Sequence, residues 1–220
     1  MPELPEDPAR VPEYLESLHL FEAVSFSDED LARTAQYQAE ASRTQAQAKF
    51  SDFNEFLRSL EMEAEIKPFD SFHNPRIAQL TQRSNQFNLR TQRYTEAEIA
   101  QIAASDRFIT RYMTLSDRFG EHGLISLVIL EKQADALFID TWIMSCRVLR
   151  RGVEDALFNA VVEIAKECGA KKLIGEYLPT AKNRMVEGFY AGYGMKPVGG
   201  GRYELNPEDY QPRAHLIHVR

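Results

Sequence analysis

Cys146 is one of two cysteines in the chain, and its neighbours suit covalent chemistry. Arg147 follows it directly, and Arg150 and Arg151 stand close behind. Positive charge and the free N–H groups of a helix N-terminus favour the thiolate, which is the nucleophilic form of cysteine. Two interpretations stay open from these residues alone: a reactive nucleophile, or a buried apolar cysteine. Cys168 ends an apolar helical pattern, so we expect it to be an ordinary cysteine.

His122 is the histidine best placed to act as a base. It stands in a polar segment, Asp117 to Gly123, between two runs rich in strand-forming residues. An imidazole titrates near neutral pH and can accept the proton of a thiol. The alternative is an ordinary histidine of a surface turn. The remaining histidines lie in segments without a site pattern: His19, His73, His215 and His218.

The basic stretch from Cys146 to Gly152 lies between a predicted strand and the clearest helical pattern of the chain. A turn from strand to helix leaves free backbone N–H groups that bind phosphate well. Arg147 and Arg151 add positive charge at the same place. The stretch therefore predicts a phosphate-binding loop, with an exposed basic turn as the alternative.

Two polar segments could contact a small ligand. The first, residues 81–88, surrounds Phe87 with polar side chains that include Asn85 and Asn88. Such groups are costly to bury unless they are paired, so they either bind a small polar ligand or lock their own loop. The second segment holds Lys182 and Asn183, which we expect near the same ligand.

The elements that position these residues form an α/β pattern. Runs rich in Val, Ile, Phe, Tyr and Thr predict three successive strands, residues 108–117, 123–131 and 136–145. A helix with apolar residues at helical spacing follows over residues 153–165. Further along we expect a strand at 171–178, a helix at 186–194 and a hairpin at 195–205. Before the strands, Thr95 and Glu98 form a capping-box pattern that begins a helix.

Residues 1–65 differ from the remainder in composition. They are polar and helix-forming, and the stretch 38–49 has almost no large apolar residue to bury. We expect a helical linker or collar over 1–65, followed by one domain over 66–220.

Composition excludes several classes of function. The net charge of −7 disfavours nucleic-acid binding, which needs a basic surface. No apolar run is long enough to cross a bilayer, and the start of the chain does not resemble a signal peptide, so we expect a cytoplasmic protein without membrane contact. Neither a Cys-x-x-Cys nor a His-x-x-x-His pair occurs, so we expect no metal site.

Two motifs resemble the GNAT acyltransferase superfamily. That superfamily carries Gln/Arg-x-x-Gly-x-Gly/Ala in the basic loop, and its amides hold the pyrophosphate of coenzyme A. Arg147 and Gly152 match the first and last positions, whereas Arg150 replaces the first glycine, so we expect weak coenzyme A binding. The second motif matches at Asn183, Phe189, Tyr190 and Gly194. The resemblance implies a GNAT-like sheet, mixed and mostly antiparallel, flanked by helices, with Tyr190 as the group that protonates a departing thiolate. The alternative for Tyr190 is a helix aromatic packed in the core.

A closer resemblance is to the C-terminal half of FkbH-like proteins. It rests on QLTQRSNQFNLRTQRYT, DRFGEHGL, IDTWIMSCRVL and the PTAKN segment, in this order. FkbH-like proteins join an N-terminal HAD-type phosphatase domain to a GNAT-like domain. The aspartate motif of the phosphatase does not occur in this chain. The resemblance therefore implies the second domain with its collar, and it assigns Cys146 as the residue that carries the acyl group.

This resemblance implies an acyltransferase that moves a small glyceryl-type hydroxyacyl unit onto an acyl carrier protein, as in methoxymalonyl-carrier and polyketide biosynthesis. The acceptor is the phosphopantetheine arm of the carrier, with coenzyme A as the second candidate, and no cofactor is tightly bound. The expected partners are the carrier and the HAD-like domain. Two alternatives stay open: a coenzyme A-dependent N-acyltransferase, and a docking domain without catalysis.

Overall fold

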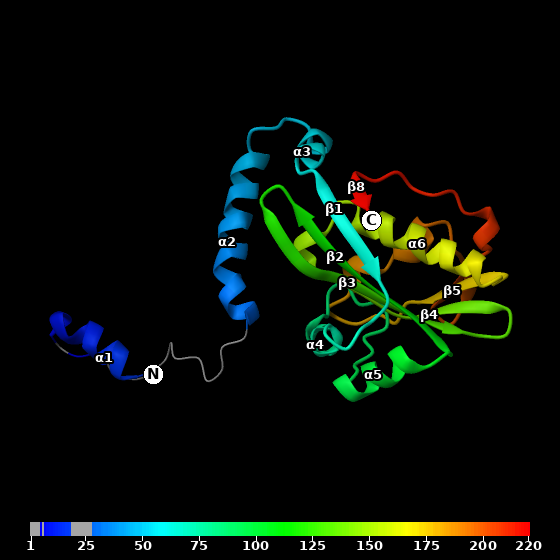
Figure 1. Ribbon diagram of the computed structural model, residues 1–220, viewed down its shortest axis with the longest axis horizontal. Helices are drawn as coiled ribbons and strands as arrows, with labels where there is room; N and C mark the ends of the chain where they lie inside the picture. Colours follow the sequence, from blue (N-terminus) through cyan, green and yellow to red (C-terminus); the bar gives the residue numbers. More distant parts are fainter. Residues whose placement is uncertain (1–4, 6, 19–27) are drawn as a thin grey trace.

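The computed structural model describes Pro5, residues 7–18 and residues 28–220, with side chains of the last part from Tyr37 onward. Within them, one eight-stranded sheet has the order β6-β7-β5-β4-β3-β2-β1-β8 (Figure 1). The strands are β1 (Met62–Lys67), β2 (Phe108–Asp117), β3 (Gly120–Lys132), β4 (Ala136–Met144), β5 (Lys172–Glu176), β6 (Lys196–Gly199), β7 (Arg202–Leu205) and β8 (Ile217–Val219).

Most neighbouring strands in this sheet are antiparallel. The parallel pairs are β4 with β5 and β1 with β8. The register from β2 to β4 is long and continuous, with small irregularities near Met113 and Ile129. The predicted α/β class with a mixed, mostly antiparallel sheet is therefore confirmed, and β2 has the bounds that its sequence predicts.

Helices cover both faces of the sheet, and this explains why β3 is apolar almost throughout. Alternate β3 side chains enter two separate cores. Ile125, Val128 and Leu130 face the core that contains α6 (Val153–Glu167) and α7 (Phe189–Gly192). Leu124, Leu127 and Ile129 face α4 (Asn74–Arg83) and α5 (Glu96–Ala104), which begins at the predicted capping box (Figure 1).

The N-terminal part joins the same structure. After α1 (Val11–Ser17), α2 (Asp28–Gln47) lies alongside the β2–β3 hairpin (Figure 1). Next, α3 (Phe53–Ser59) buries Phe56 and Leu57 in the core that α6 occupies. The expected division at residue 65 thus falls within β1, so the structure places no break there.

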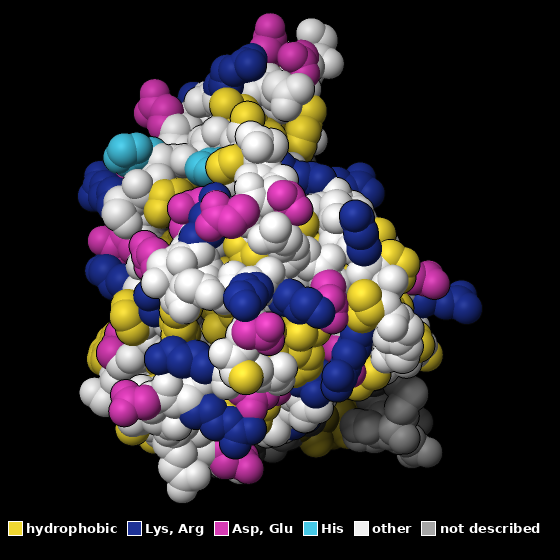
Figure 2. Space-filling model, turned by 90° about the vertical axis from the view of Figure 1, so that its right-hand side faces the viewer, with side chains coloured by type: hydrophobic (Ala, Val, Ile, Leu, Met, Phe, Trp, Pro, Cys, Tyr) yellow, Lys and Arg dark blue, Asp and Glu magenta, His cyan; other side chains and the backbone are white. Residues whose placement is uncertain are grey.

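Several short 3-10 helices complete the described part: η1 (Pro8–Arg10), η2 (Cys146–Val148), η3 (Arg184–Val186) and η4 (Pro207–Asp209). The face in Figure 2 carries basic and acidic side chains interspersed, so no single sign of charge dominates it. Among the helices that the structure describes, none combines the length and the apolar character of a membrane span.

Tyr190 packs its ring against β5 at the one position of that strand without a side chain. A Cβ at Gly175 would lie 2.4 Å from two atoms of the Tyr190 ring. We expect Gly175→Ala to lower the free energy of unfolding by about 1–3 kcal/mol, because overpacking a filled core forces side chains and backbone to shift. Urea unfolding measures this. Gly188→Ala is the control, since nothing lies within 4 Å of a Cβ there, and equal losses in both variants would contradict the packing.

Candidate functional site

A cavity of about 390 Å³ lies where α2, α4 and the start of β3 meet, beside η2. Its walls are rich in charged groups that the four elements contribute separately. They include Glu40 and Arg43 of α2, Arg76 and Arg83 of α4, His122 of β3, and Arg147 of η2. Segments distant in the sequence therefore meet around one cavity, and the predicted base His122 is among its lining residues.

A larger and more open hollow, of about 1120 Å³, lies at the other end of the sheet near Lys172 and Arg213. None of the predicted site residues lines it. We therefore place the candidate site in the smaller cavity, where His122 and Arg147 lie together.

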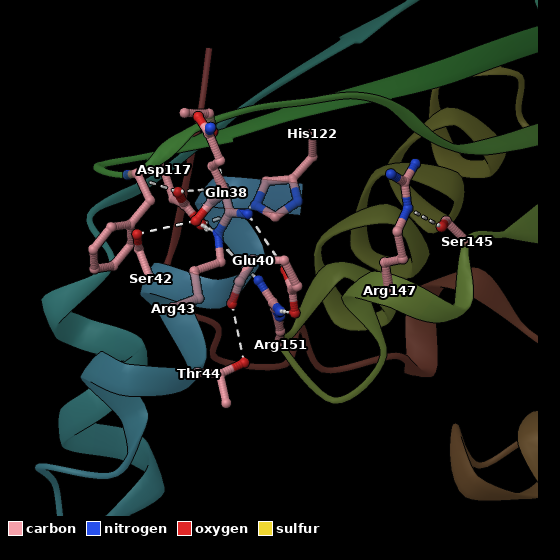
Figure 3. A network of polar contacts seen from close by, with 12 residues as sticks. Gln38, Glu40, Ser42, Arg43, Thr44, Asp117, His122, Ser145, Arg147 and Arg151 are labelled. Carbon is pink, nitrogen blue, oxygen red and sulfur yellow. Dashed lines mark hydrogen bonds and ion pairs between the residues drawn. The ribbon is translucent and has the colours of Figure 1, made fainter. Parts of the chain in front are cut away.

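His122 is held by a buried carboxylate on the wall of the cavity. Its Nε2 lies 2.9 Å from Oδ2 of Asp117, at the end of β2 across a tight turn (Figure 3). The side chains of His122 and Asp117 are 4% and 0% exposed. His122 is thus a buried residue of β3, and the alternative of a surface-turn histidine is wrong.

Asp117 is fully occupied by donors from three directions. Arg43 donates from Nε to Oδ2 at 2.7 Å and from Nη2 to Oδ1 at 2.8 Å. The backbone N–H of Phe119 donates to Oδ1 at 2.9 Å. Burial by itself raises the pKa of Asp117, but the hydrogen bonds from His122, Arg43 and Phe119 outweigh it and hold this pKa well below its usual range. Asp117 is therefore an ionised partner for His122.

The second ring nitrogen of His122, Nδ1, makes no hydrogen bond with any residue that the structure describes. A carboxylate that accepts the Nε2 proton leaves Nδ1 as the lone-pair nitrogen, as in catalytic pairs where a carboxylate fixes the tautomer of a histidine. The arrangement can accept a proton from a group that enters the cavity.

Arg151 takes part in this network instead of pointing at a ligand. Its side chain, 11% exposed, lies 3.5 Å from Oε1 of Glu40 and 3.9 Å from Oδ2 of Asp117 (Figure 3). Burial lowers the pKa of Arg151, although the neighbouring Glu40 and Asp117 oppose the shift. Its predicted role in binding substrate is thus replaced here by contacts within the chain.

Cys146 is exposed and begins η2, two residues after β4 ends. The N–H of Ser145, the residue before it, donates to the carbonyl of Ile125 at 2.8 Å, so Cys146 lies beside the β3 segment that carries His122. No hydrogen bond joins Cys146 to His122 in the described part of the chain. The exposed thiol does not fit the alternative of a buried apolar cysteine.

The helix N-terminus expected beside Cys146 lies further along the chain. The long helix α6 begins at Val153, and η2 is only a single short turn. Arg147, the residue after Cys146, lines the cavity. Cys168, at the C-terminal cap of α6, is exposed as well.

The loop before α6 does not fit the pyrophosphate of coenzyme A. The N–H of Arg150 donates to Oε1 of Glu154 at 3.0 Å, so a carboxylate of the chain itself takes a loop amide. Burial raises the pKa of Glu154. A Cβ at Gly152 would lie 3.2 Å from Cβ of His215, so the C-terminal segment covers this glycine. An anionic phosphate would meet a carboxylate and a covered surface there.

We therefore expect coenzyme A to give no calorimetric signal of binding tighter than about 1 mM with the native chain. Arg150→Gly alone leaves the Glu154 carboxylate in place, so it is expected to gain little. Adding Glu154→Gln removes the repelling charge and should strengthen binding, whereas Glu163→Gln, an exposed position on the same helix, should not. Micromolar binding by the native chain would contradict the loop geometry.

The buried asparagines of the predicted site serve the protein itself. Asn88 and Asn183 are both fully buried, and Nδ2 of Asn183 donates to the Asn88 carbonyl at 3.0 Å. Oδ1 of Asn183 accepts from the Thr180 N–H at 2.7 Å, and Oδ1 of Asn88 accepts from the Thr91 N–H at 2.7 Å. These side chains therefore form hydrogen bonds that hold the loops of the protein itself. For residues 81–88, this was the alternative to binding a ligand.

The loop that these asparagines lock closes the gap where β4 and β5 diverge. The N–H of Met144 donates to the Phe87 carbonyl at 3.2 Å, and the N–H of Leu178 donates to the Leu89 carbonyl at 2.9 Å. Arg90 pairs with Glu176 of β5 at 2.7 Å. Residues 87–90 therefore bridge the two strands.

The other predicted residues are also away from the cavity. Asn85 accepts a hydrogen bond from Arg93, and Lys182 is exposed. Tyr190 is only 1% exposed, its buried hydroxyl lacks a hydrogen-bond partner among the described residues, and burial raises its pKa strongly. The structure thus presents Tyr190 as a core residue. Of the predicted residues, His122 and Arg147 line the cavity and Arg151 contacts Asp117, whereas Cys146, next to Arg147 in the sequence, is not among the lining residues.

Four contributors to the site were not predicted from the sequence. Arg43 lies in a helix that carries no site pattern, and Arg76 and Arg83 lie on an amphipathic helix. Asp117 had a weak signal, because it precedes His122 by five residues across a predicted strand turn. A carboxylate and a histidine on facing ends of a hairpin can meet, as they do here.

Neither a protein-family model nor a curated protein sequence matches the chain. Solved structures do resemble it. A domain from Methanocaldococcus jannaschii is 15% identical, with 66% of this chain and 99% of that one covered and a TM-score of 0.50. The ribosomal-protein-S18-alanine N-acetyltransferase from Escherichia coli is 17% identical over 64% and 88%, with a TM-score of 0.46. The GNAT domain of S. lividans PAT is 18% identical over 64% and 89%, with a TM-score of 0.48. The likeness to the Methanocaldococcus jannaschii domain shows a shared α/β fold.

Proposed function

We propose that this chain is an acyltransferase domain that moves a small hydroxyacyl unit of glyceryl type onto the phosphopantetheine thiol of an acyl carrier protein. The observation that carries the proposal is the buried Asp117–His122 pair on the wall of a cavity that also contains Arg147, the neighbour of Cys146. A histidine oriented by a carboxylate beside an exposed thiol is an arrangement that activates a nucleophile.

In the first step, Nδ1 of His122 takes the proton of the Cys146 thiol. The sulfur attacks the carbonyl carbon of an acyl phosphate, the new C–S bond forms, and the C–O bond to the phosphate breaks. Phosphate leaves with the electron pair of that bond. The arginines of the cavity, Arg83 and Arg147 among them, suit the charge of the donor. The step requires that the exposed thiol turns toward the imidazole.

In the second step, the carrier thiol gives its proton to a base and attacks the thioester on Cys146. The C–S bond to Cys146 breaks, and the sulfur of Cys146 leaves as a thiolate. We propose His122 as the base for this proton as well. After the first step it passes the proton of Cys146 to solvent and returns to its neutral form, so it can accept a second proton. The acyl unit then lies on the carrier, and the chain is ready for a new cycle.

Transfer to a carrier is preferred over a coenzyme A-dependent reaction because the loop before α6 does not accommodate pyrophosphate. A carrier presents its thiol on an arm whose phosphate is tied to the carrier surface. This arm carries no pyrophosphate for the loop to bind.

The test is a transfer reaction that contains the full chain, a hydroxyacyl phosphate and a carrier protein bearing its arm. We expect the intact mass of the carrier to increase by one acyl unit, and a carrier without the arm to stay unchanged. His122→Gln should slow the gain. Binding of the carrier without any gain in mass would favour the docking domain and contradict the proposal.

A further inference from the structure

We propose that Arg43 is a positioning residue for His122, so that helix α2 forms part of the functional site. This inference rests on the proposed role of His122 as a base. Arg43 lies within residues 1–65, where composition predicts only a linker or collar. Its side chain is 4% exposed and reaches across to the β2–β3 hairpin.

The contact between Arg43 and Asp117 is a two-pronged one that fixes both carboxylate oxygens. Nε and Nη2 each donate to a different oxygen, at 2.7 Å and 2.8 Å. Nη2 also lies 3.3 Å from the carbonyl of Gly120, the first residue of β3. Arg43 therefore contacts both the end of β2 and the start of β3, and holds them together. A planar guanidinium can do this, whereas an ammonium provides only a point charge.

The orientation of the His122 imidazole depends on these hydrogen bonds from Arg43 to Asp117. Oδ2 of Asp117 receives both the Nε of Arg43 and the Nε2 of His122, so the carboxylate plane set by Arg43 also sets the direction of the imidazole. Without Arg43, Arg151 is the arginine that the described part of the chain still places near Asp117, with a nitrogen 3.9 Å from Oδ2. The carboxylate would then be free to rotate, and the imidazole of His122, which lines the cavity, would lose its fixed partner.

Glu40 is a second residue of α2 that contributes to this network. Its carboxylate lies 3.3 Å from Nη1 of Arg43 and 3.5 Å from Nη2 of Arg151. One turn of α2 thus supplies the cation that holds Asp117 and the anion that holds Arg151 (Figure 3). Ala46, about one turn further along α2, is buried in the core and packs the helix against the domain.

The experiment compares Arg43→Gln and Arg43→Lys in the full chain. Long-range proton–nitrogen spectra of the imidazoles report which ring nitrogen carries the proton, and His122→Gln identifies the signals of His122. The native chain is expected to show one tautomer, protonated at Nε2. Arg43→Gln should give a mixture of tautomers and lower kcat on the order of 10- to 100-fold with little change in KM, because the base is misaligned. Arg43→Lys should have a tautomer mixture and a kcat between those of the native chain and those of Arg43→Gln.

Arg58→Gln, an exposed arginine of α3, is the control and should behave like the native chain. A folded Arg43→Gln variant with the native tautomer and native kcat would overturn the inference. If that variant fails to fold, Arg43→Lys decides by the same two measurements. A native chain that transfers nothing, but whose His122 tautomer still responds to Arg43, would contradict the proposed function while supporting the positioning role.

Discussion

Cys146→Ala is expected to lower the rate of acyl transfer by about 10³-fold or more, because the proposed reaction passes through a thioester on this sulfur. The measurement is the increase in carrier mass with time under saturating donor. Cys168→Ala is the matched control, since Cys168 is also exposed but lies at the C-terminal cap of α6. It should retain the native rate.

Alkylation with limiting iodoacetamide gives a second measure of the same difference. Cys146 is expected to react before Cys168, because it lies next to Arg147 of the cavity wall, whereas Cys168 lies at the C-terminal cap of α6. A Cys146→Ala chain that transfers at the native rate would show that the sulfur is not the nucleophile. The acyl unit would then pass directly from donor to carrier.

Asp117→Ala should have the largest effect on stability, lowering the free energy of unfolding by about 3–5 kcal/mol at neutral pH. The substitution removes the anion that Arg43 and His122 share, and among the described residues it leaves Glu40 as the carboxylate beside the buried guanidinium. Urea unfolding of the two chains gives the difference. Asp106→Ala, at an exposed position, should change stability very little.

The effect of Asp117 also depends on pH, with a definite sign. The pKa of Asp117 is depressed in the folded chain, whereas in the unfolded chain it is about 3.9. The carboxylate therefore stabilises the fold fully above that value, and this contribution is lost as the pH falls below it. Asp70 and Glu176 also have lowered pKa values, but they are present in both chains and cancel in the comparison. The gap between native and Asp117→Ala should narrow in acid, and a gap that stays constant would contradict the ion pair.

Local patterns were sufficient for the central elements of the fold. The strands β2 to β4 are long apolar runs, and α6 repeats apolar residues at helical spacing, so periodicity identified them. The sheet edge was different. In β1 (Met62–Lys67), glutamates alternate with apolar residues, so its sequence resembles a polar segment. Strand β8 has only three residues. Both strands exist because their partners are nearby in space, and a sequence pattern carries no such information.

The site could be predicted only in part for the same reason. Cys146, Arg147 and His122 stand in segments whose composition points to chemistry, and the structure brings their segments together. Arg43 meets Asp117 across 74 positions of the chain, and Glu154 and His215 fill the loop that was expected to bind phosphate. Asn183 matches a family motif, yet its hydrogen bonds go to the backbone around it. Residue type indicated these positions, but only the tertiary contacts show which groups are already engaged.

The most direct test of the account is the intact mass of the full chain after incubation with a hydroxyacyl phosphate in the absence of carrier, followed by peptide mapping. The account predicts one acyl unit per chain, located on the peptide that contains Cys146, and its loss when carrier with its arm is added. Formation of this adduct should be slower in His122→Gln. An unmodified chain that nevertheless acylates the carrier, or an adduct on Cys168, would contradict the central claim.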